Sequence, residues 1–281
     1  MDLSLIKQKL AASQNKGQKK TYEKIDYSKI FWKPKPGKYQ IRILPSKFDK
    51  SNPFREVYFH YGFAKGPIVA LTNFGEKDPI VEFAKNLRKS SDKEDWQLAK
   101  KIEPKLRYFA PVIVRGEEDK GARLWEFGKL IYEQLLGIAA DEDYGDYTDI
   151  TDGRDFTVDA VEDMVANKKA IKCNLRVKPK TSPISEDAAL VTKVLEEQPD
   201  IFAINRKLSF DDLKVILDKW LNPDEDTETP IASAETEEED NINGEDDFLK
   251  EMNAPVEQTY KLDTKASKTS NSDKFNDLFN D

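Results

Sequence analysis

Hydrophobic and polar residues alternate along several short stretches of this chain, and such alternation predicts β-strands. The stretches cover residues 37–45, 54–63, 66–71, 105–115, 121–128, 156–161 and 169–178. Within 105–115, Arg107 and Phe109 fall on one face, whereas Leu106 and Tyr108 fall on the other. The short polar stretch 116–120 predicts a turn, so residues 105–128 are expected to form a hairpin.

Helical periodicity occupies the segments between these strands. It predicts helices at residues 79–89, 93–102, 130–140, 183–198 and 209–221. Asp78 and Ser209 suit the N-caps of the first and last helices, and Pro104 prevents the second from continuing. Short strands with inserted helices predict an α+β fold, mainly β, and fit an oligonucleotide-binding (OB) barrel. Other five- or six-stranded α+β domains fit the same pattern.

Charge is distributed unevenly along the chain. Residues 1–130 hold 28 Lys and Arg against 16 Asp and Glu, an excess of 12 positive charges. Residues 222–281 hold 5 against 18, an excess of 13 negative charges, and their apolar residues are sparse. We therefore predict a flexible basic arm (1–24), a folded core (25–221) and a disordered acidic tail (222–281).

Residues that build most catalytic and metal sites are scarce in this sequence. His60 and Cys173 are the only histidine and cysteine, and no CxxC, HExxH or glycine-rich phosphate-binding loop occurs. We therefore expect no enzyme activity. A lone cysteine cannot form an internal disulfide, which fits a reducing compartment. Because no apolar run suits a signal peptide or a membrane span, we expect a soluble intracellular protein.

Basic and aromatic side chains share the predicted hairpin 105–128. An unpaired nucleic-acid strand needs positive charge beside its phosphates and flat rings beside its bases, so the hairpin favours single-strand binding. One alternative is that the rings fill the core while the charges are solvated. Another is an acidic-tailed scaffold that binds proteins and no nucleic acid. RNA also remains open as a ligand, because a base-stacking groove accepts either sugar.

Several segments together carry a family resemblance. They are Ile41-Arg42-Ile43-Leu44-Pro45-Ser46-Lys47 with Asp49 and Pro53-Phe54, then Gly62-Phe63, Tyr108-Phe109-Ala110, Phe127-Gly128-Lys129 and the terminal Asn276-Asp277-Leu278-Phe279-Asn280-Asp281. In this order they resemble the single-stranded DNA-binding protein family of T-even-type bacteriophages. The resemblance implies an OB fold and cooperative, sequence-independent coating of single-stranded DNA during replication, recombination and repair. It also implies the cytoplasm of an infected bacterial host as the location.

The resemblance also assigns roles to individual residues. By position, the DNA contacts correspond to Arg42, Lys47, Trp96, Lys100, Lys101, Lys105, Arg107, Tyr108 and Trp125. The basic arm, here with Lys7 and Lys9, is implied to contact the neighbouring protomer in a filament. The acidic tail is implied to recruit replication and recombination proteins, with Phe275, Leu278 and Phe279 as its recognition residues. Its charge also predicts competition with DNA for a basic cleft.

One departure from the family concerns zinc. The type member binds a structural zinc through a histidine and three cysteines, whereas the corresponding places here hold Tyr61, Leu71, Asp78 and Val81, with Pro79 retained. Only Asp78 among these could ligate zinc, so we predict no metal and no other cofactor. We expect this subdomain to be held instead by packing of Ile80, Val81, Phe83 and Leu87.

Overall fold

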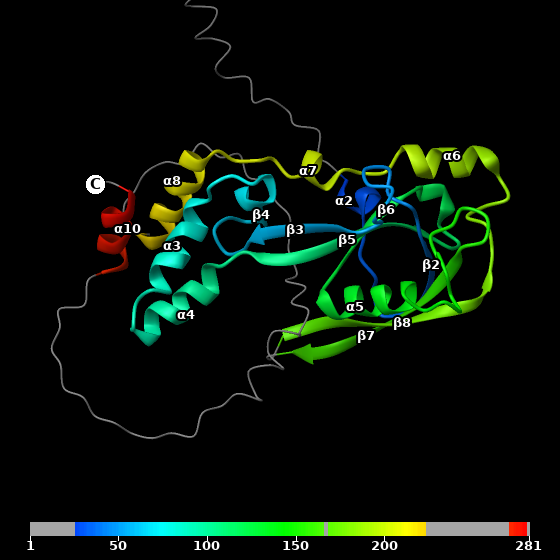
Figure 1. Ribbon diagram of the computed structural model, residues 1–281, viewed down its shortest axis with the longest axis horizontal. Coiled ribbons are helices and arrows are strands. Elements are labelled where there is room, and N and C mark those ends of the chain that lie inside the picture. The colour runs from blue at the N-terminus through cyan, green and yellow to red at the C-terminus, as the bar shows by residue number, and fades with distance from the viewer. Residues whose placement is uncertain (1–25, 166–167, 223–269, 280–281) are drawn as a thin grey trace, which may run out of the picture.

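The computed structural model describes residues 26–165, 168–222 and 270–279 of the 281-residue chain. The predicted basic arm, with Lys7 and Lys9, and most of the predicted tail lie outside these residues. Within them, a β-rich part carrying α5 (Lys129–Ala139) and α6 (Ala188–Glu196) is joined to a cluster of helices by the long strands β3 and β5 (Figure 1). The mixed α+β, mainly β composition agrees with the prediction.

One sheet organises the β-rich part. Its order is β1 (Phe31–Trp32), β6 (Arg123–Phe127), β5 (Lys105–Val114), β2 (Gly37–Ile43), β7 (Arg154–Val165) and β8 (Lys168–Thr181), while β3 (Arg55–His60) pairs with β5 and with β4 (Ile68–Val69). Only the β1–β6 pair is parallel among the pairings in these residues. The pairings leave β1 and β8 as the edges of an open sheet, so a closed OB barrel is not confirmed.

The predicted alternation in β5 is confirmed and explains where the main core lies. Tyr108, Ala110 and Val112 are buried in one hydrophobic cluster together with Ile41 of β2 and Phe156 of β7. On the opposite face, Phe109 and Ile113 enter two separate clusters. Because side chains of a strand alternate between faces, one strand supplies three apolar clusters at once.

Several helices form a small lobe at the far end of β3 and β5 (Figure 1). It contains α3 (Pro79–Leu87), α4 (Lys93–Ile102) and α8 (Phe210–Leu221). The expected caps are present: Asp78 accepts hydrogen bonds from two N–H groups of α3, and Ser209 forms a capping box with Asp212 on α8. Ile80, Phe83 and Leu87 are buried in the lobe as predicted, whereas Val81 is only half-buried.

Several short elements escaped prediction. They are α2 (Tyr27–Ile30), α7 (Ile201–Ile204) and the 3₁₀ helices η2 (Leu71–Phe74) and η3 (Glu118–Lys120). Residues 183–198, predicted to be one helix, are helical only in α6, because Asp187 caps α6 four residues after Pro183. Single-turn elements carry too few residues to show a period.

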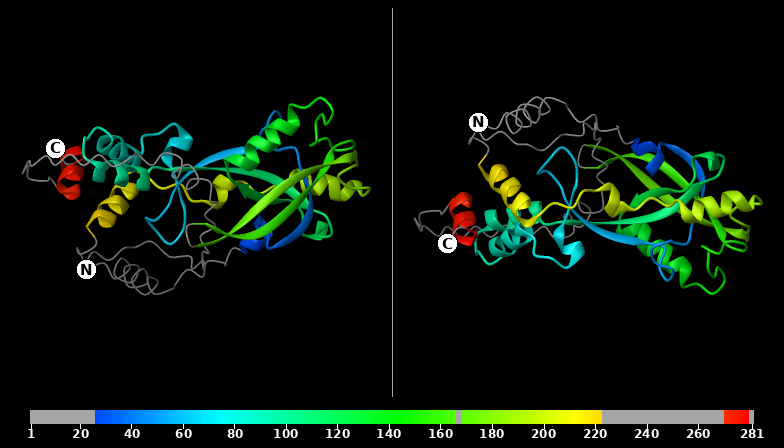
Figure 2. Two further views of the ribbon diagram at one scale, coloured as in Figure 1. Left: turned by 90° about the horizontal axis from the view of Figure 1, so that it is seen from below. Right: turned by 90° about the horizontal axis from the view of Figure 1, so that it is seen from above.

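The prediction of disorder is wrong for the last part of the tail. Residues Asn271–Phe279 form helix α10, which packs on α8 and places Phe275 inside the helical lobe (Figures 1 and 2). Ser270 and Asp273 cap this helix through reciprocal hydrogen bonds. Acidic composition predicted no buried surface here, yet Phe275 and Phe279 lie one helical turn apart and supply an apolar stripe.

Candidate nucleic-acid interface

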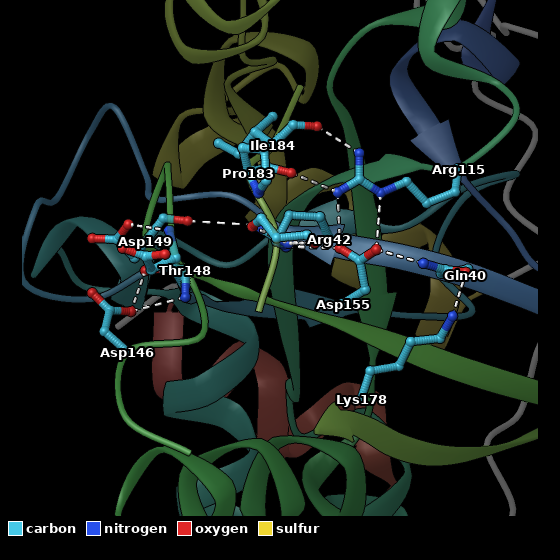
Figure 3. Close-up of polar contacts among 12 residues, drawn as sticks. Gln40, Arg42, Arg115, Asp146, Thr148, Asp149, Asp155, Lys178, Pro183 and Ile184 are labelled. Atoms are coloured by element: carbon cyan, nitrogen blue, oxygen red, sulfur yellow. Dashed lines mark hydrogen bonds and ion pairs between the residues drawn. The ribbon is translucent and has the colours of Figure 1, made fainter. Parts of the chain in front are cut away.

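Arg42, a predicted DNA contact, lies inside the protein. Its side chain is 0 % exposed, and its Nε donates a 2.8 Å hydrogen bond to Oδ1 of Asp155. Its Nη2 donates to the carbonyl and hydroxyl oxygens of Ser182 at 2.8 and 2.7 Å. Its Nη1 donates to the Asp149 carbonyl at 3.4 Å (Figure 3). The structure therefore assigns Arg42 to an internal ion pair, because no part of its guanidinium reaches the surface.

A second arginine completes this cluster. Arg115 donates two hydrogen bonds to the Asp155 carboxylate, at 3.0 and 2.9 Å, and Gln40 donates a third (Figure 3). Burial acts to raise the pKa of Asp155, but the hydrogen bonds from Arg115 and Gln40 and the charges of both arginines outweigh it and lower the pKa. We call Gln40, Arg42, Arg115 and Asp155 the Arg42–Asp155 cluster.

Two predicted aromatic contacts are also buried. Trp125 is 1 % exposed and packs edge-on against Trp32, with ring centroids 5.5 Å apart. Tyr108 is buried and stacks on Tyr132 at 3.9 Å between ring centroids. These rings form core contacts, as the alternative interpretation of the hairpin expected. Neither ring is exposed to solvent, whereas a ring that stacks on a DNA base has to be.

Arg107 and Lys105 lie on the face of β5 opposite Tyr108. Arg107 is partly exposed, with Nε 3.5 Å from Oε1 of Glu126 and its guanidinium 5.8 Å from the ring centroid of Tyr61. Lys105 is half-buried. The hairpin therefore separates these two cations from Tyr108, as strand alternation predicted, although the family resemblance assigned all three residues to DNA contact.

Helix α4 brings three predicted contacts to the surface of the helical lobe. Trp96 is 53 % exposed, and Lys100 and Lys101 are both exposed. The guanidinium of Arg88 lies 4.0 Å from the Trp96 ring centroid and is held there by two hydrogen bonds to Glu103. This α4 patch presents one open ring and several cations.

A second surface brings rings and cations together from β3, η2, α7 and the loops beside them. Its members, which we call the ring–cation row, are Lys47, Phe48, Arg55, Phe202, Phe74 and Lys207. The Arg55 guanidinium lies 5.6 Å from the Phe48 ring centroid and 4.8 Å from that of Phe202. The Phe202 and Phe74 centroids are 5.2 Å apart, and Nζ of Lys207 is 4.6 Å from Phe74.

Local hydrogen bonds fix the start of this row. Gln198, which is buried, accepts a 2.9 Å hydrogen bond from the Lys47 backbone N–H and donates a 2.8 Å bond to the Pro45 carbonyl. It thereby ties the loop that carries Phe48 to the segment that carries Phe202. Phe48 and Phe74 are 42 % and 37 % exposed, so each ring offers area to a flat ligand.

Comparison with known families identifies the family of this chain. The chain matches the family described as "gp32 DNA binding protein like" over residues 35–222, more than half of its length. The chain belongs to this gp32-like family. The match confirms the resemblance to T-even-type phage single-stranded DNA-binding proteins and supports a DNA-binding role. A comparison with curated proteins found no match.

The zinc site that the family resemblance raised does not fit the residues present here. Asp78 Oδ2 accepts hydrogen bonds from His60 Nε2 and the Leu71 N–H at 2.9 and 2.8 Å, and its Oδ1 accepts from the first N–H groups of α3. Leu71 and Val81 carry no ligating side-chain atom. In the part of the chain that the structure describes, no three His, Cys, Asp or Glu residues lie close enough together to hold a metal ion.

Most of the ring–cation row of this gp32-like chain was not predicted from the sequence. Lys47 was predicted from the family resemblance, but Phe48, Arg55, Phe74, Phe202 and Lys207 were not. One available signal was Phe48 itself, a large aromatic residue in a polar loop between Pro45 and Pro53. The other members gather only because η2 and α7 fold beside the start of β3.

None of the described helices is long and apolar enough to cross a membrane.

Proposed function

We propose that this chain binds single-stranded DNA without reading its sequence. The observation that carries the proposal is the ring–cation row, exposed on a chain of the gp32-like family. Rings can stack on any base and cations attract any phosphate, so alternation of the two suits an unpaired strand of any sequence. A duplex hides its base faces, so the row offers it only its positive charge.

The DNA contacts in this proposal combine two surfaces. Lys47, Phe48 and Arg55 begin the ring–cation row, and Trp96, Lys100 and Lys101 form the α4 patch. Both surfaces carry cations beside exposed rings, namely Phe48 and Phe74 in the row and Trp96 in the α4 patch. Lys105 and Arg107 supply further charge at the start of β5.

The finer parts of the proposal follow the family resemblance. We propose that binding is cooperative, through the arm with Lys7 and Lys9, and that the protein acts without catalysis in phage replication, recombination and repair. The acidic tail would recruit other replication and recombination proteins. The cytoplasm of an infected bacterium is the proposed location.

The proposal is tested by titrating the full-length chain into labelled oligo-dT at rising salt and measuring fluorescence anisotropy. We expect tight binding at low salt and a linear fall of log affinity with log salt, since each neutralised phosphate releases counterions. Quenching of tryptophan fluorescence is expected too, because Trp96 is exposed. An oligo-rU arm measures the preference for DNA over RNA. Absence of binding to oligo-dT at low salt would favour the protein-scaffold alternative.

A further inference from the structure

Helix α10 contacts two helices of the lobe, α3 and α8, through its two aromatic residues. Phe275 is 1 % exposed, and its ring centroid lies 6.2 Å from that of Phe83 on α3. Phe279 packs on Phe275 at 5.1 Å and on Phe210 of α8 at 6.2 Å. The views from above and below both place α10 against the helical lobe (Figure 2).

Polar contacts anchor the same face of α10. Nζ of Lys274 lies 2.6 and 2.7 Å from the two carboxylate oxygens of Asp95 on α4, a residue that is itself buried. Nζ of Lys214 on α8 donates a 2.9 Å hydrogen bond to the Phe279 carbonyl at the end of α10. The contact is therefore specific in charge as well as in shape.

We propose that Phe83, Asp95, Phe210 and Lys214 form a docking surface for the chain's own C-terminal helix, which exchanges between docked and released states. The surface selects an amphipathic helix with two aromatic residues one turn apart and a lysine before the first. Docking hides Phe275 and half-buries Phe279, two of the three residues predicted to recognise partners. A partner that takes this face of α10 therefore competes with the docking surface.

Two observations support exchange over permanent attachment. The helix has nine residues, and a helix of that length has little stability by itself in water, so α10 depends on the docked contacts. Residues 223–269 join α8 to α10, although these two helices are in contact and a short loop would suffice. A connection of this length gives only a moderate effective concentration, which an external helix can exceed.

The competition with partners rests on the proposed recruiting role of the tail, but docking itself does not. The test uses a labelled peptide of residues 268–281 and the full-length chain. We expect the peptide to bind the double variant Phe275→Ala, Phe279→Ala at least about tenfold more tightly than wild type, whose docking surface is already occupied. The matched control is full-length Asp277→Asn, which alters an exposed residue of the same helix and should behave as wild type.

A second measurement covers the chance that the double variant disturbs the lobe. Lys274→Glu leaves both rings in place but sets a carboxylate against buried Asp95, so it should increase hydrogen exchange at amides 271–279 while exchange in α3 stays unchanged. The same change in the peptide should abolish its binding. Equal peptide affinity for wild type and the double variant, or wild-type protection in Lys274→Glu, would overturn the proposal. Neither readout involves DNA, so the result is independent of DNA binding.

Discussion

The Arg42–Asp155 cluster and the ring–cation row both contain arginine, but the side chain has a different role in each. In the cluster, two guanidiniums converge on one carboxylate and the side chain of Arg42 has no exposed area (Figure 3). In the row, the Arg55 guanidinium lies between two phenylalanine rings, and Phe48 stays 42 % exposed. A buried carboxylate turns an arginine into a structural element, whereas exposed rings leave a cation available to a ligand.

This difference separates stability from binding within one family motif. Arg42 and Lys47 stand five residues apart in the segment that resembles phage DNA-binding proteins. Only Lys47 is exposed, beside Phe48. The motif therefore combines a residue that holds β2 to β7 with one that lies on the candidate interface. Variants in the two regions should change different measurable quantities.

Replacement of Asp155 by alanine should give the largest effect, and it should be on stability. The change leaves two arginines without their shared carboxylate, one of them fully buried, which costs about 3–5 kcal/mol of unfolding free energy. Denaturant unfolding followed by circular dichroism measures this. DNA affinity of the folded fraction should remain near wild type.

The matched control is Glu103→Ala, which removes the carboxylate from Arg88 in a pair that is exposed to solvent on both sides. It should cost about 1 kcal/mol or less. Similar losses for the two variants would show that burial does not distinguish the Arg42–Asp155 cluster.

Acid should weaken the same cluster more mildly, because a protonated Asp155 keeps some hydrogen bonds. The folded-state pKa of Asp155 lies below its ordinary value of 3.8, so the unfolded chain takes up this proton first as pH falls. The stabilisation is complete above that ordinary value and is lost as pH falls through the folded-state pKa. Unfolding free energies measured from pH 6 to pH 2 should show a shallower acid limb in Asp155→Asn than in wild type. Parallel limbs would contradict this role.

Local sequence signals were sufficient to predict much of the fold. The alternation in β5, the bounds of α4 and the Asp78 cap all follow from residues within one strand or one helical turn. The open sheet could not be predicted, because pairing between strands depends on residues far apart in sequence. Helix α10 had a local signal in Ser270 and Asp273, but the acidic composition around it favoured disorder.

The candidate site was harder to predict than the fold. Arg42 was predicted to contact DNA because its actual partner, Asp155, stands 113 residues away and a local pattern does not reveal it. Trp125 looked like a stacking ring because a strand pattern does not say which of its faces is covered. Phe74 and Phe202 meet only through tertiary packing. Exposure of a residue is a property of the folded chain, and a single sequence reports it only weakly.

Replacement of Phe48 by alanine should lower affinity without lowering stability. Loss of one stacking ring costs about 1–3 kcal/mol of binding, or roughly 5- to 150-fold in affinity for oligo-dT. The unfolding free energy should change little, because the residue is already 42 % exposed in the folded chain. Leu136→Ala on α5 removes an apolar residue of equal exposure, 42 %, outside the row and serves as the control. Equal affinities for the two variants would exclude Phe48 from the interface.

The smallest effect is expected from Lys47→Gln, because it removes one charge and the exposed hydrogen bond from Nζ to the Glu196 carbonyl, while the Phe48 ring is retained. Gln198 holds that loop through the Lys47 backbone N–H, which the substitution retains. If Nζ of Lys47 neutralises one phosphate, the slope of log affinity against log salt should become shallower by about 0.7, the value for single strands. Arg42 cannot contribute to this slope, since it has no exposed area. An unchanged salt slope in Lys47→Gln would place the phosphate path away from the start of the ring–cation row and towards the α4 patch.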